Sequence, residues 1–198
     1  MTKPVALVDL DGTLADYSGA LHRDLTAIRS PEETGPLSYY AEEGPDPDWW
    51  RARTRMIRHQ PGWWSGLGVL ADGFEILEML REAGFAPHVL TKGPSTTPTA
   101  WTEKVQWCQN ELPGEPVTIA SDKSMVYGRV LVDDFPDYVQ PWLDMRPRGY
   151  VIMPDRPWNQ GYSHPRCVRY VHMDKGTNRE QLKDLLRLIA NREDGQAL

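Results

Sequence analysis

Cysteine is scarce in this sequence, which has only two, Cys108 and Cys167, among 198 residues. Two cysteines form at most one disulfide, so a small scaffold held together by several disulfides is excluded. Neither cysteine lies in a Cys-x-x-Cys pair or beside a histidine at the spacing of metal ligands, which argues against a zinc site. We therefore expect both to be reduced thiols.

Long apolar runs and basic clusters are missing as well. No stretch approaches the roughly 20 consecutive apolar residues of a membrane span, so we expect no membrane partner. Residues 1–4 lead directly into a strand-like segment without the layout of a signal peptide, which favours a cytoplasmic location. Lysine and arginine number 22 against 28 acidic residues, and the net charge of −6 makes duplex nucleic acid an unexpected partner.

The composition that is present is that of a globular protein. Hydrophobic residues make up 40% and charged residues 25% of the chain, which excludes the collagen-like, coiled-coil and disordered classes. Glycine and proline are frequent, at 16 and 17 residues, and indicate long ordered loops. The length of 198 residues fits one compact domain with an insertion.

Five short apolar segments are typical of strands that are buried on both faces, and each ends at a polar turn. They are residues 5–8, 86–90, 117–120, 130–132 and 150–153. Helical patterns separate several of these strands. They run over residues 72–84, with Asp72 as the expected N-cap, over residues 98–112 and over residues 177–189. Strands that alternate with helices predict an α/β fold with a doubly wound parallel sheet.

Residues 16–66 interrupt this alternation. They mix proline, glycine, glutamate and tryptophan with a short basic helical pattern at residues 50–58. We interpret them as a small, mainly helical cap that is inserted after the first strand, so that residues 1–15 and 67–198 form the core. The tryptophan-rich cap also offers an apolar surface on which a homodimer could form.

Polar side chains follow four of the five predicted strands. They are Asp9 and Asp11, Thr91, Lys123, and Asp133 with Asp134. Because the carboxyl ends of parallel strands meet at one edge of a sheet, we expect these side chains to lie close together. Clustered carboxylates repel one another unless a cation lies among them, and oxygen ligands without histidine or cysteine favour Mg²⁺. Thr91 and Lys123 suit the oxygens of a phosphoryl group.

Asp9 and Asp11 have the spacing that phosphoryl transfer through an aspartyl phosphate needs. A carboxylate beside Mg²⁺ can attack phosphorus. A second carboxylate two residues later lies on the same side of an extended chain and can act as a general acid and then as a general base. Gly12 allows a sharp turn after the strand, and the hydroxyl of Thr13 can stabilise that turn.

Four motifs therefore occur in order along the chain. They are Asp9-Leu10-Asp11-Gly12-Thr13-Leu14, Thr91, Lys123 and Asp133-Asp134. Together they resemble the motifs of the haloacid dehalogenase superfamily of phosphohydrolases. Further details between Pro4 and Gln160 resemble the 5′(3′)-deoxyribonucleotidase family. These details are Asp16-Tyr17 after the first motif, the helix start from Ala100 to Lys104, and Ser121-Asp122-Lys123-Ser124.

The resemblance implies a role for each carboxylate. Asp9 would be the nucleophile and Asp11 the general acid and base. The main-chain carbonyl of Asp11 would also be a metal ligand, together with Asp9. Asp134, with Asp133 as an additional candidate, would complete the Mg²⁺ site.

The same resemblance implies how a substrate would bind. Thr91 and Lys123 would hold the phosphate, and Lys92 joins them as a phosphate-binding candidate. The family usually has a small hydroxyl residue in place of Lys92, so this position departs from its pattern. The family also holds the nucleobase with aromatic side chains of the cap, and the matching candidates here are Tyr17, Trp63 and Trp64.

We therefore expect a Mg²⁺-dependent phosphomonoesterase that hydrolyses nucleoside monophosphates, preferably deoxyribonucleotides, to nucleoside and phosphate. The expected partner is thus a small molecule. Alternatives within the same chemistry are another small phosphate ester, a nucleic-acid 3′-phosphate end, or transfer of the phosphate to an alcohol. A non-catalytic nucleotide-binding module is the alternative from another class.

Overall fold

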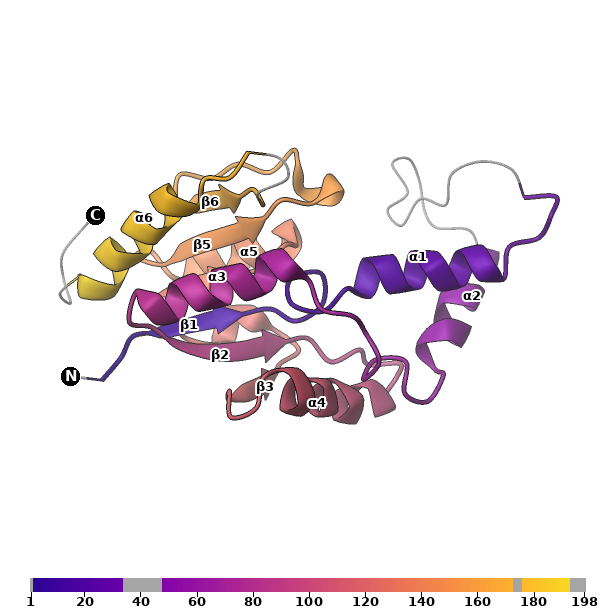
Figure 1. Ribbon diagram of the computed structural model, residues 1–198. Helices are drawn as coiled ribbons and strands as arrows, with labels where there is room; N and C mark the ends of the chain where they lie inside the picture. The colour runs from indigo at the N-terminus through magenta and orange to yellow at the C-terminus, as the bar shows by residue number, and fades with distance from the viewer. Residues whose placement is uncertain (1, 34–47, 173–175, 193–198) are drawn as a thin grey trace.

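The centre of the molecule is one six-stranded sheet, in the order β3-β2-β1-β4-β5-β6 (Figure 1). All neighbouring strands in it are parallel. The computed structural model describes residues 2–33, 48–172 and 176–192. The strands are β1 (Val5–Val8), β2 (Ala86–Thr91), β3 (Val117–Ile119), β4 (Val130–Val132), β5 (Tyr150–Pro154) and β6 (Cys167–Tyr170). The expected doubly wound parallel sheet is confirmed.

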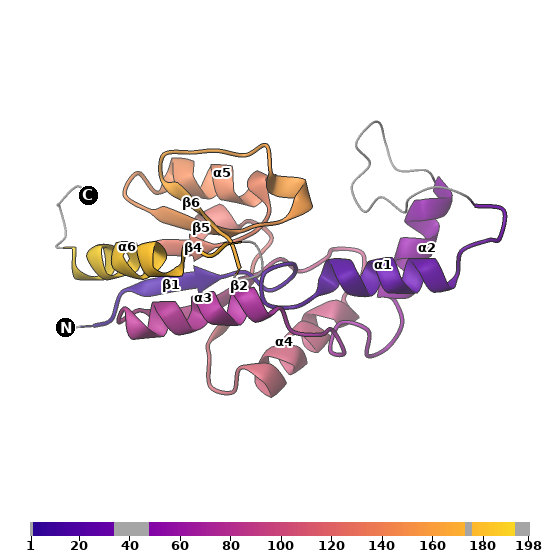
Figure 2. The same ribbon diagram turned by 45° about the horizontal axis from the view of Figure 1, so that its top comes forward.

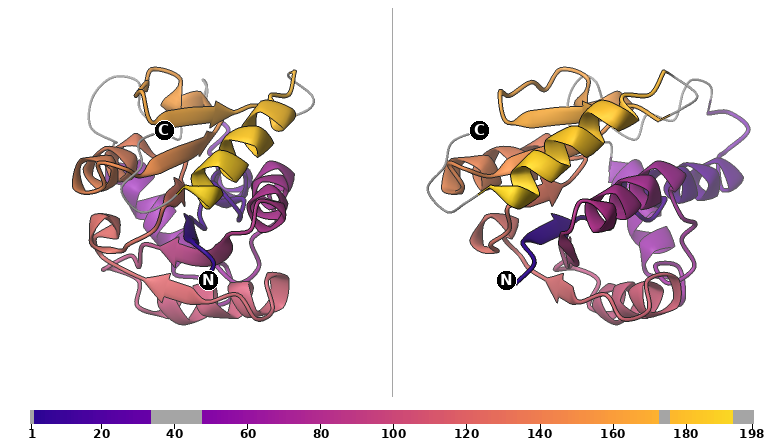
Figure 3. Two further views of the ribbon diagram at one scale, coloured as in Figure 1. Left: turned by 90° about the vertical axis from the view of Figure 1, so that its left-hand side faces the viewer. Right: turned by 60° about the vertical axis from the view of Figure 1, so that its left-hand side comes forward.

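Helices cover both faces of this sheet (Figure 3). One face packs against α3 (Ala71–Glu82), α4 (Thr99–Glu111) and α6 (Arg179–Asn191), and the other packs against α5 (Pro136–Met145). Side chains of β1 alternate accordingly: Val8 belongs to the core on the first face and Leu7 to the core on the second. Burial on both faces is the reason why the strands are continuous apolar runs in the sequence.

Three elements go beyond the sequence prediction, namely α1 (Tyr17–Ala27), α5 and β6. One local prediction is wrong. Helix α3 begins after Leu70, and no side chain caps it. The carboxylate of Asp72 instead accepts hydrogen bonds from Arg156, at 2.5 and 3.0 Å.

The predicted cap lies beyond the carboxyl ends of the strands. Helix α1 packs against α2 (Asp48–Arg58), and the arrowheads of β1 and β2 point toward this pair (Figures 1 and 2). Residues 34–47 of the predicted cap lie outside the described residues. The division into a core and an inserted cap stays a prediction, as does the homodimer.

Two expectations about composition can be compared with the described structure. Cys108 and Cys167 are both free thiols, as expected. Among the helices that the structure describes, none is long and apolar enough to cross a membrane.

Candidate active site

The candidate site lies where the order of the strands changes direction. From β1 the chain builds β2 and β3 on one side, and then β4, β5 and β6 on the other. Ligands of open α/β sheets bind at the carboxyl ends of the strands beside such a switch point. Val8 is in register with Val132. Asp9 and Asp133, which follow these two residues, therefore emerge side by side.

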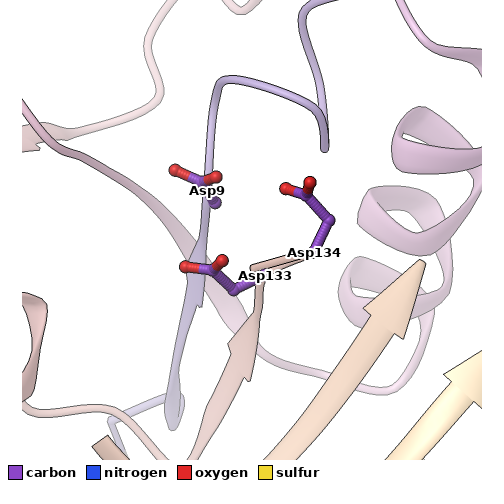
Figure 4. Close-up of side chains that lie close together, drawn as sticks. All are labelled: Asp9, Asp133 and Asp134. Atoms are coloured by element: carbon purple, nitrogen blue, oxygen red, sulfur yellow. The ribbon is translucent and has the colours of Figure 1, made fainter. Parts of the chain in front are cut away.

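Three predicted metal ligands come together at this point (Figure 4). Asp9 follows β1, and Asp133 and Asp134 follow β4. Each offers a carboxylate oxygen, and the three oxygens lie within 4.8 Å of one another. The exposed fractions of the three residues are only 4%, 0% and 3%. Buried carboxylates this close to one another need compensating positive charge.

Lys123 supplies part of that charge. It begins the short turn η1 (Lys123–Met125), and its Nζ donates to Asp9 Oδ1 at 2.5 Å and to Asp133 Oδ2 at 2.7 Å. Burial alone would lower the pKa of Lys123, but the attraction of Asp133 and Asp9 outweighs it and raises this pKa above its ordinary value. Lys123 is therefore a buried ammonium group within the carboxylate cluster.

One ammonium group does not neutralise three carboxylates. Burial, followed by repulsion from Asp133, raises the pKa of Asp134 to about 7. Burial also raises the pKa of Asp9 well above its ordinary value, although Lys123 opposes the shift. Both directions indicate unbalanced negative charge. A hard divalent cation with oxygen ligands fits this donor set, and Mg²⁺ is the natural candidate.

Asp11 and Thr91 meet at a second lysine. Lys104 of α4 is 1% exposed, and its Nζ donates to Asp11 Oδ2, to Thr91 Oγ1 at 3.1 Å and to the Lys92 carbonyl at 2.7 Å. The other carboxylate oxygen of Asp11 is buried and has no hydrogen-bond partner in the described structure. Lys104 thus connects Asp11, the predicted general acid and base, with Thr91, a predicted phosphate-binding residue.

The loop after β1 is shaped by Gly12, which has a φ of +82°. A Cβ atom at this position would lie 2.6 Å from Asp134 Oδ2, so a side chain is excluded both by conformation and by space. The hydroxyl of Thr13 donates to Asp134 Oδ1 at 3.1 Å. The loop that carries Asp9 and Asp11 is therefore in direct contact with Asp134.

A cavity of about 460 Å³ lies over these groups. The predicted site residues that line it are Asp9, Asp11, Tyr17, Trp64, Lys92, Lys123 and Asp134. Thr91 and Asp133 are fully buried and contact the site through Lys104 and Lys123. The volume is in the range of pockets that hold small molecules.

Aromatic rings form one wall of the cavity. Tyr17 stacks on Trp64, with ring centroids 5.3 Å apart and an interplanar angle of 24°. Trp63 packs edge-on against both rings, and its indole nitrogen donates to Asp24 Oδ2 at 2.8 Å. Of the three predicted base-binding residues, Tyr17 and Trp64 line the cavity, whereas Trp63 lies behind them as packing.

Lys92 lies at the cavity wall formed by α5. Its Nζ is 4.9 Å from the ring centroid of Tyr138, and the Nζ of Lys123 is 4.8 Å from the same centroid. Arg58, from α2, lines the cavity as well and donates to the hydroxyl of Tyr17 at 3.3 Å. Lys92 and Arg58 therefore add positive charge at the edge of the cavity. The buried Lys104 and Lys123, by contrast, contact carboxylates.

The chain matches a family model along nearly its whole length. The model is described as 5′ nucleotidase, deoxy (Pyrimidine), cytosolic type C protein, and the match spans residues 3–186. The chain belongs to this nucleotidase family. Membership confirms the resemblance drawn from the four motifs, and it confirms the expected enzyme class, a phosphatase of the haloacid dehalogenase type.

One solved structure with a TM-score above 0.5 supports the fold, and a second has a lower TM-score. A haloacid dehalogenase-like hydrolase from Burkholderia xenovorans LB400 has a TM-score of 0.54 and 15% identity, over 93% of this chain and 97% of that chain. A haloacid dehalogenase family hydrolase from Deinococcus radiodurans R1, with bound phosphate and sodium, has a TM-score of 0.49 and 16% identity, over 96% and 99%. No curated protein matches the chain.

Lys104 is a residue of this nucleotidase that lies outside the four motifs and contacts two residues within them. A lysine in a helix is ordinarily solvated, so its presence alone gives no signal. A weak signal lies in the spacing of the residues that α4 buries, which are Ala100, Lys104, Trp107 and Cys108. Intervals of three and four residues place Lys104 on the buried helical face, among apolar neighbours.

Proposed function

We propose that this chain is a Mg²⁺-dependent phosphomonoesterase that hydrolyses nucleoside monophosphates, preferably deoxyribonucleotides. One observation carries the proposal. The carboxylates of Asp9, Asp133 and Asp134 converge at the switch point of the sheet, and Lys123 bridges the first two. This arrangement combines a nucleophile, a cation site and a phosphate-binding ammonium group within one buried cluster. The family description supports a cytosolic location for the enzyme.

The reaction would use two carboxylates in two steps. A carboxylate oxygen of Asp9 attacks phosphorus in line, and the bond from phosphorus to the sugar oxygen breaks. Protonated Asp11 gives its proton to that oxygen, which leaves as the nucleoside hydroxyl. Ionised Asp11 then takes a proton from water, whose oxygen attacks the aspartyl phosphate and releases inorganic phosphate and Asp9.

The lysines would support both steps by electrostatics. Lys104 contacts the Asp11 carboxylate and would hold its orientation while it gives up its proton and then takes one from water. Lys123 is positioned to stabilise negative charge on the phosphoryl oxygens next to Asp9. Neither lysine needs to give up its proton for the reaction to balance.

Three carboxylates and one main-chain carbonyl would form the metal site. Asp9 and Asp134 would hold the ion directly, with Asp133 as an additional candidate and the Asp11 carbonyl as a further ligand. When bound, Mg²⁺ supplies positive charge that offsets the phosphoryl oxygens and the buried carboxylates. The three converging carboxylate oxygens and the raised pKa values of Asp9 and Asp134 support a cation at this place.

The proposed substrate follows from the cavity wall and from the family. Tyr17 and Trp64 offer aromatic surface on which a nucleobase can stack. The description of the family names deoxy and pyrimidine 5′ nucleotidases, which supports a deoxyribonucleotide. Another small phosphate ester is the second candidate, because the groups that act on phosphorus do not depend on the base.

The test is phosphate release from a panel of substrates, each with Mg²⁺ and with a chelator. The panel contains 5′-deoxyribonucleotides, 5′-ribonucleotides, 3′-nucleotides and sugar phosphates. We expect Mg²⁺-dependent release that is fastest with deoxyribonucleotides. Activity on sugar phosphates alone would retain the chemistry and overturn the nucleotide assignment.

Replacement of the nucleophile gives the second arm of this test. We expect Asp9→Asn to abolish turnover while the protein stays folded, because the amide cannot form the acyl phosphate. Circular dichroism and the thermal midpoint check the fold. Substantial turnover by this variant would contradict the assignment of Asp9.

A further inference from the structure

The turn between β5 and β6 contacts the carboxylate cluster from outside the four motifs. It includes Arg156 and the short helix η2 (Pro157–Asn159). The indole nitrogen of Trp158 donates to Asp134 Oδ2 at 2.8 Å. The side-chain amide of Asn159 donates to the main-chain carbonyl of Asp134 at 2.9 Å. Two residues of one turn therefore hold the side chain and the backbone of a predicted cation ligand.

The same turn holds the loop after β1. Arg156 Nε donates to the Gly12 carbonyl at 2.9 Å, and its two terminal nitrogens bind the Asp72 carboxylate at 2.5 and 3.0 Å. This two-fold ion pair is largely buried, so the guanidinium group is held in one orientation. Arg156 thus places the loop that carries Asp9 and Asp11 relative to the turn.

The turn is itself fixed by hydrogen bonds. Asn159 accepts from the backbone nitrogen of Arg156 at 3.2 Å and donates to the Pro154 carbonyl at 2.9 Å. Arg169 of β6 donates to the side-chain oxygen of Asn159 and, at 2.7 Å, to its carbonyl. Asn159 is 1% exposed. The turn is therefore a rigid support and not a loose loop.

Asp134 is held at both carboxylate oxygens. Thr13 donates to Oδ1 and Trp158 donates to Oδ2. An indole N–H donates and cannot accept, and together with the Thr13 hydroxyl on the other oxygen it restrains the orientation of the carboxylate. Mg²⁺ requires nearly octahedral geometry with short bonds, which makes its affinity sensitive to the orientation of each ligand.

We propose that Trp158 is a positioning residue for the divalent-cation site, and that it acts by holding Asp134 through the indole N–H. This inference rests on the proposed function, since it requires Asp134 to be a cation ligand. Arg156 and Asn159 support the same geometry from either side of Trp158. Outer contacts of this kind typically contribute ~10-fold to 100-fold to metal affinity.

The test is calorimetric titration of Mg²⁺ into the purified, metal-free protein and into Trp158→Phe. Phenylalanine keeps an aromatic ring and loses only the donor and part of the ring system. We expect Trp158→Phe to bind Mg²⁺ ~10-fold to 100-fold more weakly than the wild type. The binding of Ca²⁺, which tolerates irregular geometry, should weaken less, so the preference for Mg²⁺ over Ca²⁺ should fall.

Trp63→Phe is the matched control. Trp63 also donates its indole N–H to a carboxylate at 2.8 Å, but this carboxylate belongs to Asp24, outside the cluster. We expect the dissociation constant of this variant for Mg²⁺ to equal that of the wild type. Urea unfolding without metal measures whether the two substitutions destabilise the chain to a similar extent.

The outcomes separate this inference from the proposed function. If the wild type binds no Mg²⁺, the metal site of the proposed function fails. If the wild type binds Mg²⁺ and Trp158→Phe binds it within twofold as tightly, the role of Trp158 is overturned. Should Trp158→Phe not fold, Trp158→Met replaces it, because methionine fills apolar volume and its side chain has no N–H to donate to Asp134. Unchanged Mg²⁺ affinity in Trp158→Met would equally overturn the inference.

Discussion

Lys104 and Asp11 form an ion pair across 93 residues of sequence, and this pair joins helix α4 to the loop after β1. Replacement of Lys104 by methionine keeps the length of the side chain and removes its charge. Asp11 and the hydroxyl of Thr91 then lose their shared donor. We expect kcat/KM for the preferred nucleotide to fall roughly 100-fold, because the predicted acid and base loses its orientation.

Lys183→Met provides the control for that substitution. Lys183 lies on α6 and pairs with Glu82 of α3 at 3.0 Å, away from the cavity. Lys183 does not line the cavity and its partner is exposed to solvent, so steady-state rates should not change. A Lys104→Met enzyme with kcat/KM within threefold of the wild type would contradict the role of the ion pair.

The raised pKa of Asp134 predicts how the stability of the metal-free protein depends on pH. Burial, with repulsion from Asp133, raises this pKa to about 7 in the folded chain, above the ordinary value of 3.8. A raised carboxyl pKa means that the folded state binds the proton more tightly than the unfolded state does. The free energy of unfolding should therefore decrease as the pH rises from about 4 to about 7.

Comparison with Asp134→Asn isolates this contribution, because asparagine does not titrate. In the presence of a chelator, the wild type should lose stability relative to Asp134→Asn over that pH range. Added Mg²⁺ should restore the wild type near neutral pH and not the variant. Thermal or urea unfolding at several pH values measures both effects. Parallel pH profiles of the two proteins would show that Asp134 does not titrate as described.

The exposed charge of Lys92 leads us to expect that its replacement weakens substrate binding, and that the size of this effect depends on ionic strength. Lys92 lines the cavity next to Tyr138, and within the described chain it takes part in no ion pair. We expect Lys92→Ser to raise KM about 10-fold with little change in kcat, since an exposed charge attracts the phosphate before the chemical step. The KM of the variant should also depend less on salt than that of the wild type. An unchanged KM at low salt would exclude Lys92 from phosphate binding.

If Tyr17 stacks on the base, its removal should affect the hydrolysis of nucleotides and not the hydrolysis of phosphate esters that have no base. Removal of the ring in Tyr17→Ala should lower kcat/KM for deoxyribonucleotides about 10-fold, as expected when one base loses an aromatic stacking partner. Hydrolysis of glycerol phosphate, which has no base, should be unaffected. Tyr17→Phe is the control, because it keeps the ring and removes the hydroxyl to which Arg58 donates. Equal losses with both substrates would indicate that the ring supports the fold instead.

Most of the sheet could be predicted because its strands are buried on both faces. β1 and β4 have the predicted bounds, and β2 and β5 extend one residue further. The edge strand β6 escaped prediction, since its four residues include Arg169 and are only partly buried before Tyr170. Such a strand leaves no continuous apolar run, which was the signal that identified the others.

The two helices that escaped prediction contain residues that oppose helix formation. In α5 such a residue is Pro141, which lies inside the helix. Proline lacks the N–H that the helix interior needs, and so the local sequence argues against a helix that tertiary packing nevertheless stabilises. α1 has Gly19 in its first turn, where the carboxylate of Asp16 accepts from the glycine N–H.

The residues of the candidate site that could be predicted are those that directly follow strands. Asp9, Asp11, Asp133 and Asp134 each follow a strand, so the topology brings them together. Lys104, Trp158 and Arg156 lie on a helix and in a turn, and their contacts with the site arise only from packing between distant segments. Apart from the weak helical spacing around Lys104, no local pattern distinguishes them from surface residues of the same type.

The turn at residues 156–159 has a consequence for the order of events during synthesis. Asp9, Asp11 and Asp134, like every residue with a proposed part in the chemistry, lie N-terminal to this turn. A growing chain that has just passed Asp134 therefore holds all of its reactive groups before the support for their arrangement exists. Only when β5 has joined the sheet can Trp158 and Arg156 reach Asp134 and Gly12. The arrangement of the proposed site is thus completed only by a segment that follows Asp134, its last reactive residue, in the sequence.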